Sequence, residues 1–304
     1  MSKYAVIDVG TNSIKFLMTE QDSAGNWSVV LDTAEITRLG EGLQTSGKIN
    51  PEAMERNVKA IRELMAATQK EGVSEVAAVG TMALRTAKNA AEFVQQVKKE
   101  CGLNVEIIPG EEEARLSYLA VKSGIGLSIG KLVIFDTGGG STEFIFGKDD
   151  GIEKKFSLNV GAVRFSEQIL KSDPITDEEY NSAVNAIEEA LNELKFEGKV
   201  DALVGMGGTM SNLGAVKHKL KVYDPDVIQG SKLELSDVEQ LISLFKVKTI
   251  KQRKKIIGLQ PKRADVILAG AIIVQTILKK AGVGFATISD RGLRHGLIVD
   301  RFGN

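Results

Sequence analysis

Two stretches of the chain show the same order of apolar and polar positions. Residues 5–7 are apolar and end in Asp8, a polar turn follows over residues 10–13, and residues 14–18 are again apolar and β-prone. The same order returns in the second half, at residues 132–135, Asp136, residues 138–141 and residues 144–146. Each stretch predicts a strand, a tight turn and a second strand, because β-prone runs interrupted by glycine and polar residues are typical of hairpins.

The two stretches superpose with an offset of 128 residues and share the pattern Asp-x-Gly-x-x-Ser-x-x-Phe. The identical pairs are Asp8/Asp136, Gly10/Gly138, Ser13/Ser141 and Phe16/Phe144. Solenoid repeats recur every 20–50 residues or so, so this longer spacing favours an internal duplication that produced two related domains. The alternative, that two such hairpins recur by chance, stays open at this point.

Helical and strand patterns alternate over the rest of the chain, which predicts an α/β fold. Asn50 and Pro51 begin a helix that closes at Gly72, and Thr176 with Glu179 forms a capping box. Ser236 with Glu239 is read as another capping box. Further helices are expected over residues 89–101, 111–122 and 267–278, and strands over residues 76–79, 105–108 and 203–204. Glycines at 124, 126 and 130 place a domain boundary near residues 123–129.

Composition narrows the possible functions. The 304 residues are 43% hydrophobic and 26% charged, which excludes a disordered chain and a membrane channel. A formal net charge of −1 provides no global field to attract DNA, RNA or an anionic membrane. One cysteine, Cys101, and two histidines, His218 and His295, exclude a disulfide framework, a cysteine zinc site and a histidine metal cage. We therefore expect a cytoplasmic protein without a signal peptide or a membrane span.

Both Asp-x-Gly turns suit a complex of a metal ion and phosphate. A carboxylate at a strand end can hold Mg²⁺, and unhindered glycine N–H groups can close on phosphate oxygens. The glycine cluster that runs from Gly205 to Thr209 offers a further anion site where a strand passes into a helix, although tight strand–helix packing would explain it equally.

Three adjacent acids, Glu111–Glu113, allow two interpretations. By composition they form the solvated first turn of a helix, where acidic residues are favoured. Alternatively, one of them is a general base that activates a water molecule. Arg85 follows a buried strand and is either a ligand contact or half of a surface ion pair. The basic stretch, residues 246–255, is interpreted as a solvated face that could alternatively guide a polyanion.

These segments together resemble the exopolyphosphatase/guanosine pentaphosphate phosphohydrolase (Ppx/GppA) family in its short two-domain form, within the superfamily of actin, sugar kinases and chaperone ATPases. The matching segments are residues 5–15, 81–85, 110–115, 136–143, 205–209 and 263–265. The resemblance implies two ribonuclease-H-like domains, residues 1–124 and 125–288, with the active site in the cleft between them. It also implies that residues 289–304 pack back on the first domain.

The resemblance further implies Mg²⁺-dependent hydrolysis of a terminal phosphoanhydride. By motif position, Glu113 matches the catalytic glutamate and Glu143 a second catalytic carboxylate, while Asp136, Gly138 and Asp8 are the expected metal site. The expected phosphate contacts are Asn12, Ser13, Lys15, Arg85, Gly139, Gly140, Ser141, Gly207, Gly208 and Thr209. Many relatives carry arginine where Lys15 stands, so the geometry of that contact is less fixed here.

The expected substrate is polyphosphate, with guanosine pentaphosphate as the alternative, K⁺ as a further activator, and a homodimer as the assembly. Two rival functions remain at this stage. One is an ATP-dependent sugar or acetate kinase, because the glycines at 205–208 also resemble an adenosine-contacting loop. The other is a sensor that binds guanosine tetraphosphate or polyphosphate without hydrolysing it.

Overall fold

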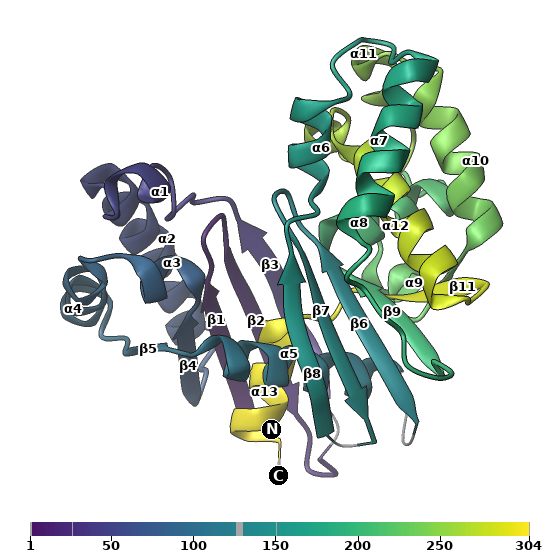
Figure 1. Ribbon diagram of the computed structural model, residues 1–304. Helices are drawn as coiled ribbons and strands as arrows, with labels where there is room; N and C mark the ends of the chain where they lie inside the picture. Colours follow the sequence, from purple (N-terminus) through teal and green to yellow (C-terminus); the bar gives the residue numbers. More distant parts are fainter. Residues whose placement is uncertain (1, 26, 126–129, 150, 304) are drawn as a thin grey trace. The chain divides into compact units, whose positions relative to one another are not determined.

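The computed structural model describes residues 2–25, 27–125, 130–149 and 151–303, with the side chains of residues 44 and 45 also left aside. The chain divides into two compact units, which are considered separately (Figure 1). Unit 1 comprises Met1–Ala120 and Leu293–Asn304, and unit 2 comprises Val121–Gly292. Each unit is an α/β layer structure built on one mixed sheet, so the predicted fold class is confirmed.

The sheet of unit 1 has the strand order β3-β2-β1-β4-β5. Its strands are β1 (Ser2–Val9), β2 (Ile14–Gln21), β3 (Trp27–Glu35), β4 (Glu75–Gly80) and β5 (Val105–Ile107). The first three form an antiparallel meander, whereas β4 and β5 lie parallel to β1. This order and these directions define a ribonuclease-H-like sheet.

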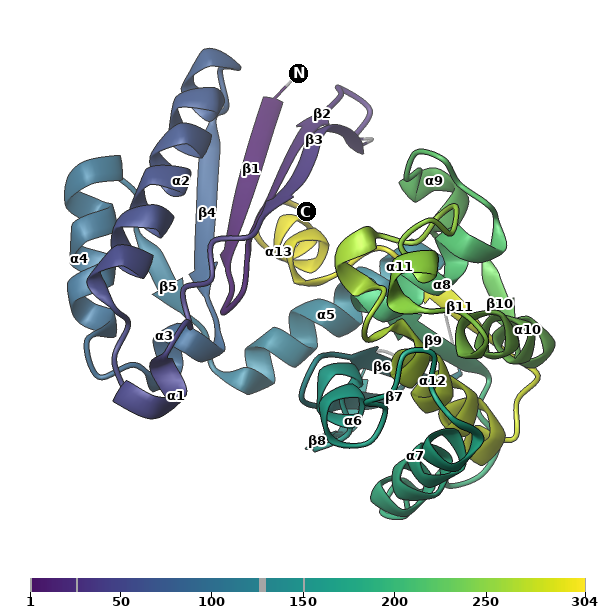
Figure 2. The ribbon, with the colours of Figure 1, turned by 90° about the horizontal axis from the view of Figure 1, so that it is seen from above.

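Helices cover both faces of the unit 1 sheet (Figure 2). The helices are α1 (Leu43–Ser46), α2 (Pro51–Lys70), α3 (Met82–Thr86), α4 (Ala90–Cys101), α5 (Gly110–Ile125), which runs on into unit 2, and α13 (Leu293–Phe302). Alternate residues of β1 face opposite sides. Ile7 packs with α2 and α4 in one core, and Val6 packs with α5 and α13 in another. Asp8 therefore shares its face of the sheet with Val6, α5 and α13.

Unit 2 repeats this topology. Its sheet has the order β8-β7-β6-β9-β11-β10, in which β8 to β11 reproduce the order of unit 1 and β10 adds an antiparallel edge. The strands are β6 (Lys131–Thr137), β7 (Thr142–Lys148), β8 (Gly151–Leu158), β9 (Ala202–Met206), β10 (Lys232–Glu234) and β11 (Phe285–Ser289). The register also repeats, because Asp8 pairs with Lys15 as Asp136 pairs with Glu143, at the same offset of 128 residues. The duplication inferred from sequence is thus a structural one.

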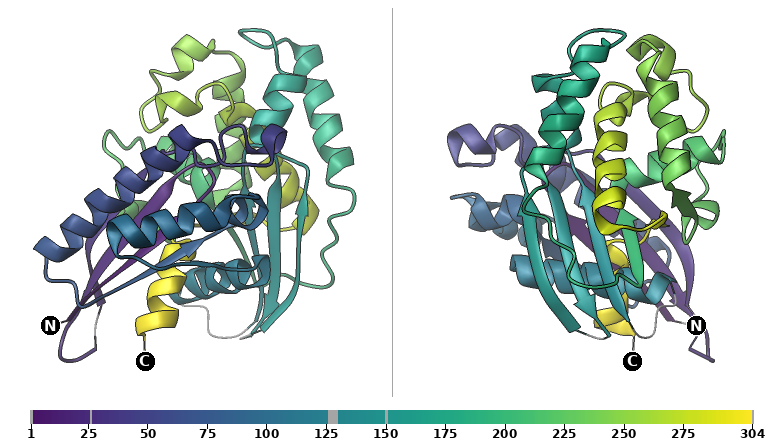
Figure 3. Two further views of the ribbon diagram at one scale, coloured as in Figure 1. Left: turned by 90° about the vertical axis from the view of Figure 1, so that its left-hand side faces the viewer. Right: turned by 45° about the vertical axis from the view of Figure 1, so that its right-hand side comes forward.

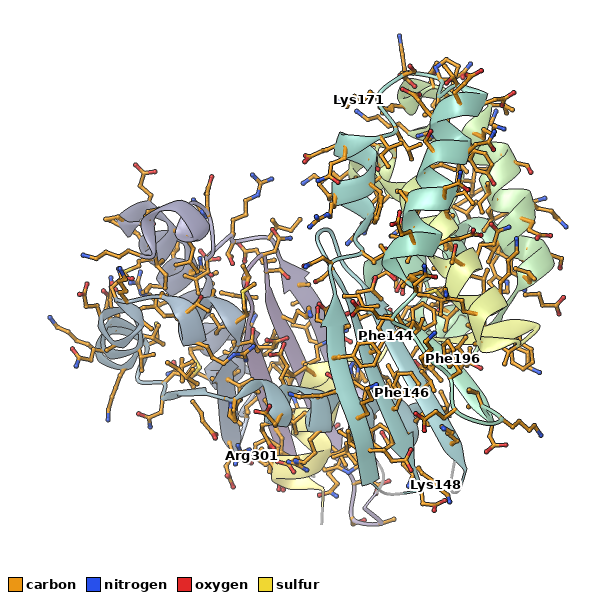
Figure 4. The ribbon with its side chains drawn as sticks, in the orientation of Figure 1. Phe144, Phe146, Lys148, Lys171, Phe196 and Arg301 are labelled. Atoms are coloured by element: carbon orange, nitrogen blue, oxygen red, sulfur yellow. The ribbon has the colours of Figure 1, made fainter. Side chains whose placement is uncertain are left out.

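The helices of unit 2 gather around α12, which lies between α7 and α10 (Figure 3). They are α6 (Ala162–Gln168), α7 (Asp177–Ala190), α8 (Gly207–Lys217), α9 (Pro225–Ile228), α10 (Leu235–Lys246), α11 (Ile250–Arg253) and α12 (Ile267–Ala281), with the 3₁₀ turn η1 (Pro261–Arg263). Every residue of α12 from Ile267 to Leu278 is buried, as its apolar sequence predicts. Phe144, Phe146 and Phe196 cluster on one side of the sheet (Figure 4).

One local prediction was wrong. Helix α10 begins at Leu235, and its capping box is formed by Glu234 and Asp237, so Ser236 lies inside the helix. The cause is β10, which pairs with β11 up to Glu234 and passes directly into the helix. Helix α5 continues to Ile125, past the start of the boundary expected near residues 123–129, and residues 126–129 lie outside the described residues.

Helix α13 is held to unit 1 by charge as well as by packing. Arg294 donates to both carboxylate oxygens of Asp32 on β3, at 2.7 and 2.9 Å, and His295 lies 3.3 Å from the same carboxylate. Arg301, at the end of the helix, pairs with Glu106 at 2.6 Å (Figure 4). Burial acts to raise the pKa of Asp32, but the hydrogen bonds from His295 and Arg294 outweigh it and hold that pKa below its usual value.

We expect Asp32→Asn to lower the free energy of unfolding at pH 7 by about 1.5–3 kcal/mol, the range for hydrogen bonds to charged groups. A carboxyl whose pKa is lowered by folding stabilises the protein above its unfolded pKa, and this contribution is lost as the pH falls through the folded pKa. Urea midpoints of the two proteins should therefore differ from pH 5 to 8, and the difference should shrink only as the pH falls below about 4 and through the folded pKa of Asp32. The control Glu35→Gln, on the same strand, should match wild type throughout; a difference for Asp32→Asn that persists in acid would contradict the prediction.

Candidate functional site

The two Asp-x-Gly turns have the same internal geometry. Gly10 N donates to Ser13 O at 3.0 Å, and Gly138 N donates to Ser141 O at 2.9 Å. The N–H groups of the two residues after each of these glycines have no acceptor among the described residues. Each turn therefore presents adjacent, unused backbone donors of the kind that bind anions.

A carbonyl group of each turn accepts hydrogen bonds from the chain segment that follows the third strand of the meander. Asn12 O accepts from Thr37 N and Arg38 N, at 3.2 and 2.9 Å. In unit 2, Gly139 O accepts from Val163 N and Arg164 N, at 2.9 and 3.0 Å. These bonds fix the carbonyl side of each turn within the unit and leave the N–H side open.

Gly161 permits this close approach in unit 2, since a Cβ at that position would overlap the backbone of Gly139 and Gly140. Gly140 is different, because a Cβ there would meet nothing within 4 Å. Packing within the chain thus does not require glycine at position 140, whereas close approach of a ligand would.

Asp8 is buried at the end of β1, with 3% of its surface exposed. Its Oδ2 lies 3.6 Å from Lys15 Nζ, and its Oδ1 has no hydrogen-bond partner among the described residues. Burial raises the pKa of Asp8, the charges of Lys15 and Arg294 oppose this, and the charge of Glu113 adds to it. A buried carboxylate oxygen without a partner is costly and is a feature of sites that hold a cation or ligand.

Arg85 and Glu113 meet in unit 1. Arg85 Nη1 lies 2.8 Å from Glu113 Oε2 and also donates to Ile108 O at 3.0 Å. This contact orients the carboxylate and leaves Oε1 without a protein partner in the part of the chain described. Arg85 is thus half of an ion pair, and its partner is the predicted catalytic glutamate.

The structure also distinguishes Glu113 from the neighbouring acid. Glu112 receives two hydrogen bonds from Arg115, at 2.8 and 2.7 Å, and Arg115 also reaches Asp300 on α13 at 2.5 Å. Glu112 therefore serves the attachment of α13. Glu113 lies three residues before the fully buried Leu116, which packs against β1, and so shares the face of α5 that meets the sheet.

Unit 2 places two carboxylates opposite each other. Asp136 on β6 pairs in register with Glu143 on β7, so both side chains leave the same face of the sheet. Glu143 Oε1 accepts hydrogen bonds from Ser141 Oγ and Ser157 Oγ, at 2.5 and 3.0 Å. Like charges directly opposite in an antiparallel pair are destabilising, so this position favours a cation.

The glycine cluster packs against Asp136. A Cβ on Gly207, whose φ is +80°, would overlap the Asp136 carboxylate. Thr209 is buried, and its hydroxyl donates to Thr137 O at 2.9 Å, which joins α8 to β6. Of the predicted phosphate contacts, Thr209 thus has only its backbone N–H to offer.

Arg263 is the site residue to which sequence reasoning assigned no role. Its guanidinium occupies the space that a Cβ on Gly208 would need, at the N-terminus of α8. It forms no ion pair or hydrogen bond with the described residues. The sequence feature that could have identified Arg263 as a site residue was its place in the Arg-Ala-Asp segment that matches the family.

The carboxylates suit a metal that shares its ligands with a substrate. The described residues hold no cluster of three or more His, Cys, Asp or Glu side chains that could enclose an ion. Mg²⁺ commonly binds one or two carboxylates and completes its octahedron with water and phosphate oxygens. Asp8 Oδ1 in unit 1, which has no partner in the part of the chain described, and the opposed Asp136 and Glu143 in unit 2 fit that requirement.

The fold of the two units defines a protein of the ribonuclease-H-like class, and comparison with known sequences names its family. The sequence model of the Ppx/GppA phosphatase family matches residues 18–304, so the chain belongs to that family. Exopolyphosphatase 2 of Mycobacterium tuberculosis is 30% identical over 100% of this chain and 99% of its own length. The predictions of the family and of a phosphohydrolase are confirmed.

Other relatives agree. A bifunctional 3-dehydroquinate synthase/phosphatase of Fusobacterium nucleatum is 32% identical over 99% of this chain, which spans about half of that protein, 46% of its length. The crystal structure of the Ppx/GppA phosphatase of Aquifex aeolicus superposes with a TM-score of 0.90, at 34% identity, covering 99% of this chain and 100% of the other. An exopolyphosphatase from Cytophaga hutchinsonii superposes with a TM-score of 0.82, at 27% identity, over 98% and 97% of the two chains. None of the helices in the described segments has the length and apolar character needed to cross a membrane.

We expect Asp8→Asn to make the protein more resistant to urea at pH 7. Folding raises the pKa of Asp8, so the native state binds the proton more tightly and wild-type stability falls as the pH rises through the range between the unfolded and folded pKa values. The gain from the substitution at pH 7 is about 1.4 kcal/mol for each unit of that shift, and it should vanish below about pH 3.9. Lys15→Met should act in the opposite sense and raise the pKa of Asp8 further, which carboxyl ¹³C NMR can follow. A lower stability of Asp8→Asn than of the wild type at pH 7 would contradict the view that folding raises the pKa of Asp8.

Proposed function

We propose that this protein is an exopolyphosphatase that releases terminal orthophosphate from inorganic polyphosphate by Mg²⁺-dependent hydrolysis. The observation that carries the proposal is the Arg85–Glu113 pair, which fixes Oε2 and leaves Oε1 without a partner among the described residues. A carboxylate held in this way can accept a proton from an attacking water. The names of the relatives from Mycobacterium tuberculosis and Cytophaga hutchinsonii support polyphosphate as the substrate.

The remaining residues would stabilise phosphate charge. In unit 1 the backbone of Asn12 and Ser13 and the side chains of Lys15 and Arg85 are available to phosphate oxygens. In unit 2 the corresponding groups are the N–H groups at Gly139, Gly140, Ser141, Gly207, Gly208 and Thr209, to which we add the Arg263 guanidinium. The transition state of phosphoryl transfer is loose and spreads charge over its oxygens, so fixed donors and cations should supply most of the acceleration.

Mg²⁺, when bound, would offset phosphate charge next to these groups. We propose Asp8 as a metal ligand in unit 1, and Asp136 and the Gly138 carbonyl as metal ligands in unit 2, with Glu143 as the second carboxylate beside Asp136. The Gly138 carbonyl already accepts from Ala162 N at 3.0 Å, so one of its two lone pairs remains for a metal. K⁺ activation and a homodimer are proposals that rest on the family resemblance alone. Sedimentation velocity would test the dimer.

We expect Glu113→Gln to lower the rate of phosphate release from medium-chain polyphosphate by about 10²–10⁴-fold, the usual contribution of a general base. Glutamine keeps the size of the side chain and its contact with Arg85, so the circular dichroism spectrum and melting temperature should not change. Glu112→Gln is the matched control, because the Glu112 side chain bonds to Arg115 and should leave the rate within about twofold. An undiminished rate in Glu113→Gln would refute the role of this glutamate.

The same assay distinguishes the alternatives when it is repeated with guanosine pentaphosphate, with and without Mg²⁺ and K⁺. Faster release from guanosine pentaphosphate would make this nucleotide the substrate. Tight binding of either ligand without release of phosphate would replace the enzyme with a sensor. Consumption of ATP only in the presence of an acceptor would indicate a kinase.

We expect Glu143→Gln to reduce the rise in melting temperature that Mg²⁺ causes in the wild type. Without the metal the substitution should be neutral or stabilising by roughly 0.2–1 kcal/mol, because it removes a like-charge pair across β6 and β7. Glu153→Gln, an exposed change on β8, controls for the loss of surface charge. An unchanged response to Mg²⁺ in Glu143→Gln would place the metal elsewhere.

A further inference from the structure

The basic stretch at residues 246–255 contains one side chain that does not belong to a solvated face. Lys251, Lys254 and Lys255 are exposed, as the sequence predicts, and Lys246 pairs with Asp177 at 2.7 Å. Arg253 is instead buried, with 3% of its surface exposed. A charge removed from water is costly unless other groups satisfy it, so this residue needs a reason of its own.

Arg253 is satisfied by backbone carbonyls of unit 2. Its Nε donates to Phe245 O at the end of α10, at 2.8 Å, and its Nη1 donates to Ala264 O at 3.4 Å. Its Nη2 is buried without a partner among the described residues. Burial lowers the pKa of the guanidinium, while the charges of Asp173 and Asp265 oppose this without forming an ion pair. The side chain thus joins the end of α10 to the segment that follows η1.

The chain just before η1 is attached to the glycine cluster. Gln260 N donates to Asn212 Oδ1 at 2.8 Å, and Asn212 Nδ2 donates to Gly208 O at the same distance. Gly258, at a φ of +91°, packs so closely on α8 that a Cβ would overlap the backbone of Ala215. Residues 258–264 are therefore held on one side by α8 and on the other by Arg253.

Arg263 lies inside this doubly attached segment. Its guanidinium covers Gly208, where α8 offers its first N–H groups, and the adjacent residue, Ala264, accepts the bond from Arg253. An arginine on a free loop would lose both backbone and side-chain freedom on binding an anion. Fixing its backbone in advance removes the backbone part of that entropic cost.

We propose that Arg253 is a positioning residue that holds the Arg263 guanidinium over Gly208 as a preformed phosphate contact. This inference rests on the proposed function, because it requires that Arg263 bind a phosphate oxygen of the substrate. Arg253 itself touches no ligand and acts only through the backbone of Ala264.

Binding of tripolyphosphate with Mg²⁺, measured by titration calorimetry in the Glu113→Gln background, tests the inference without turnover. Arg263→Met should weaken binding about tenfold, the loss expected for one charge-assisted hydrogen bond. Arg253→Met should weaken it several-fold, and the double variant should bind no more weakly than Arg263→Met alone, because the two residues act as one unit. The exposed control Lys254→Met should bind like its parent.

Arg253→Met replaces a buried charge with an apolar chain of similar length, and its melting temperature verifies the fold. If it does not fold, Arg253→Lys serves instead, since one ammonium cannot reproduce the guanidinium's two directed bonds. Additive losses in the double variant, or unchanged affinity in a folded Arg253 variant, would overturn the positioning role. Unchanged affinity in Arg263→Met would remove its premise. A parent that binds no tripolyphosphate would instead refute the proposed function itself, and the positioning role with it.

Discussion

The backbone hydrogen bond that closes each Asp-x-Gly turn determines the local geometry of both turns. Because Gly10 N bonds to Ser13 O, and Gly138 N to Ser141 O, the flanking strands pair in one register and the aspartate at the strand end gains a fixed cross-strand neighbour. The same bond turns the next N–H groups outward and the carbonyls inward, where the returning chain binds them. One local interaction thus sets the carboxylate, the anion donors and the first contact of the following segment.

Duplication gave both units this frame, and substitution at one equivalent position gave them different chemistry. Lys15 and Glu143 lie across from Asp8 and Asp136 in the same register. In unit 1 the aspartate faces a cation and shares its surroundings with Glu113 and Arg85. In unit 2 it faces a second carboxylate and packs against a glycine loop under Arg263. The aspartate of unit 1 is therefore next to a cation and an Arg–Glu ion pair, whereas that of unit 2 lies in surroundings that favour added positive charge.

The parts that the sequence predicted well are those that local spacing determines. The two hairpins, the helix that starts at Pro51 and the buried helix at 267–278 each carry their period in consecutive residues. The cap at Ser236 was wrong because the start of α10 depends on the pairing of β10 with β11, which lies about fifty residues further along the chain. Glu113 could have been separated from its neighbours by the apolar Leu116 and Ala120, three and seven residues later on the same helix face. Arg253 could not have been distinguished in this way, because a run of basic residues does not reveal which side chain is buried.

Three energetically unfavourable features of the described residues occur where chemistry is proposed. Within the described part of the chain, Asp8 is buried with one oxygen unpartnered, Asp136 pairs in register with another carboxylate, and Arg253 keeps a buried nitrogen without a bond. A core chosen for stability alone would replace each of them with an apolar or paired residue. The central strands β1 and β6 and helix α12 are, by contrast, largely apolar and buried. Strain of this kind persists only where the rest of the fold holds it in place, so the well-packed sheets allow the charged groups to stay fixed in arrangements that they would not adopt by themselves.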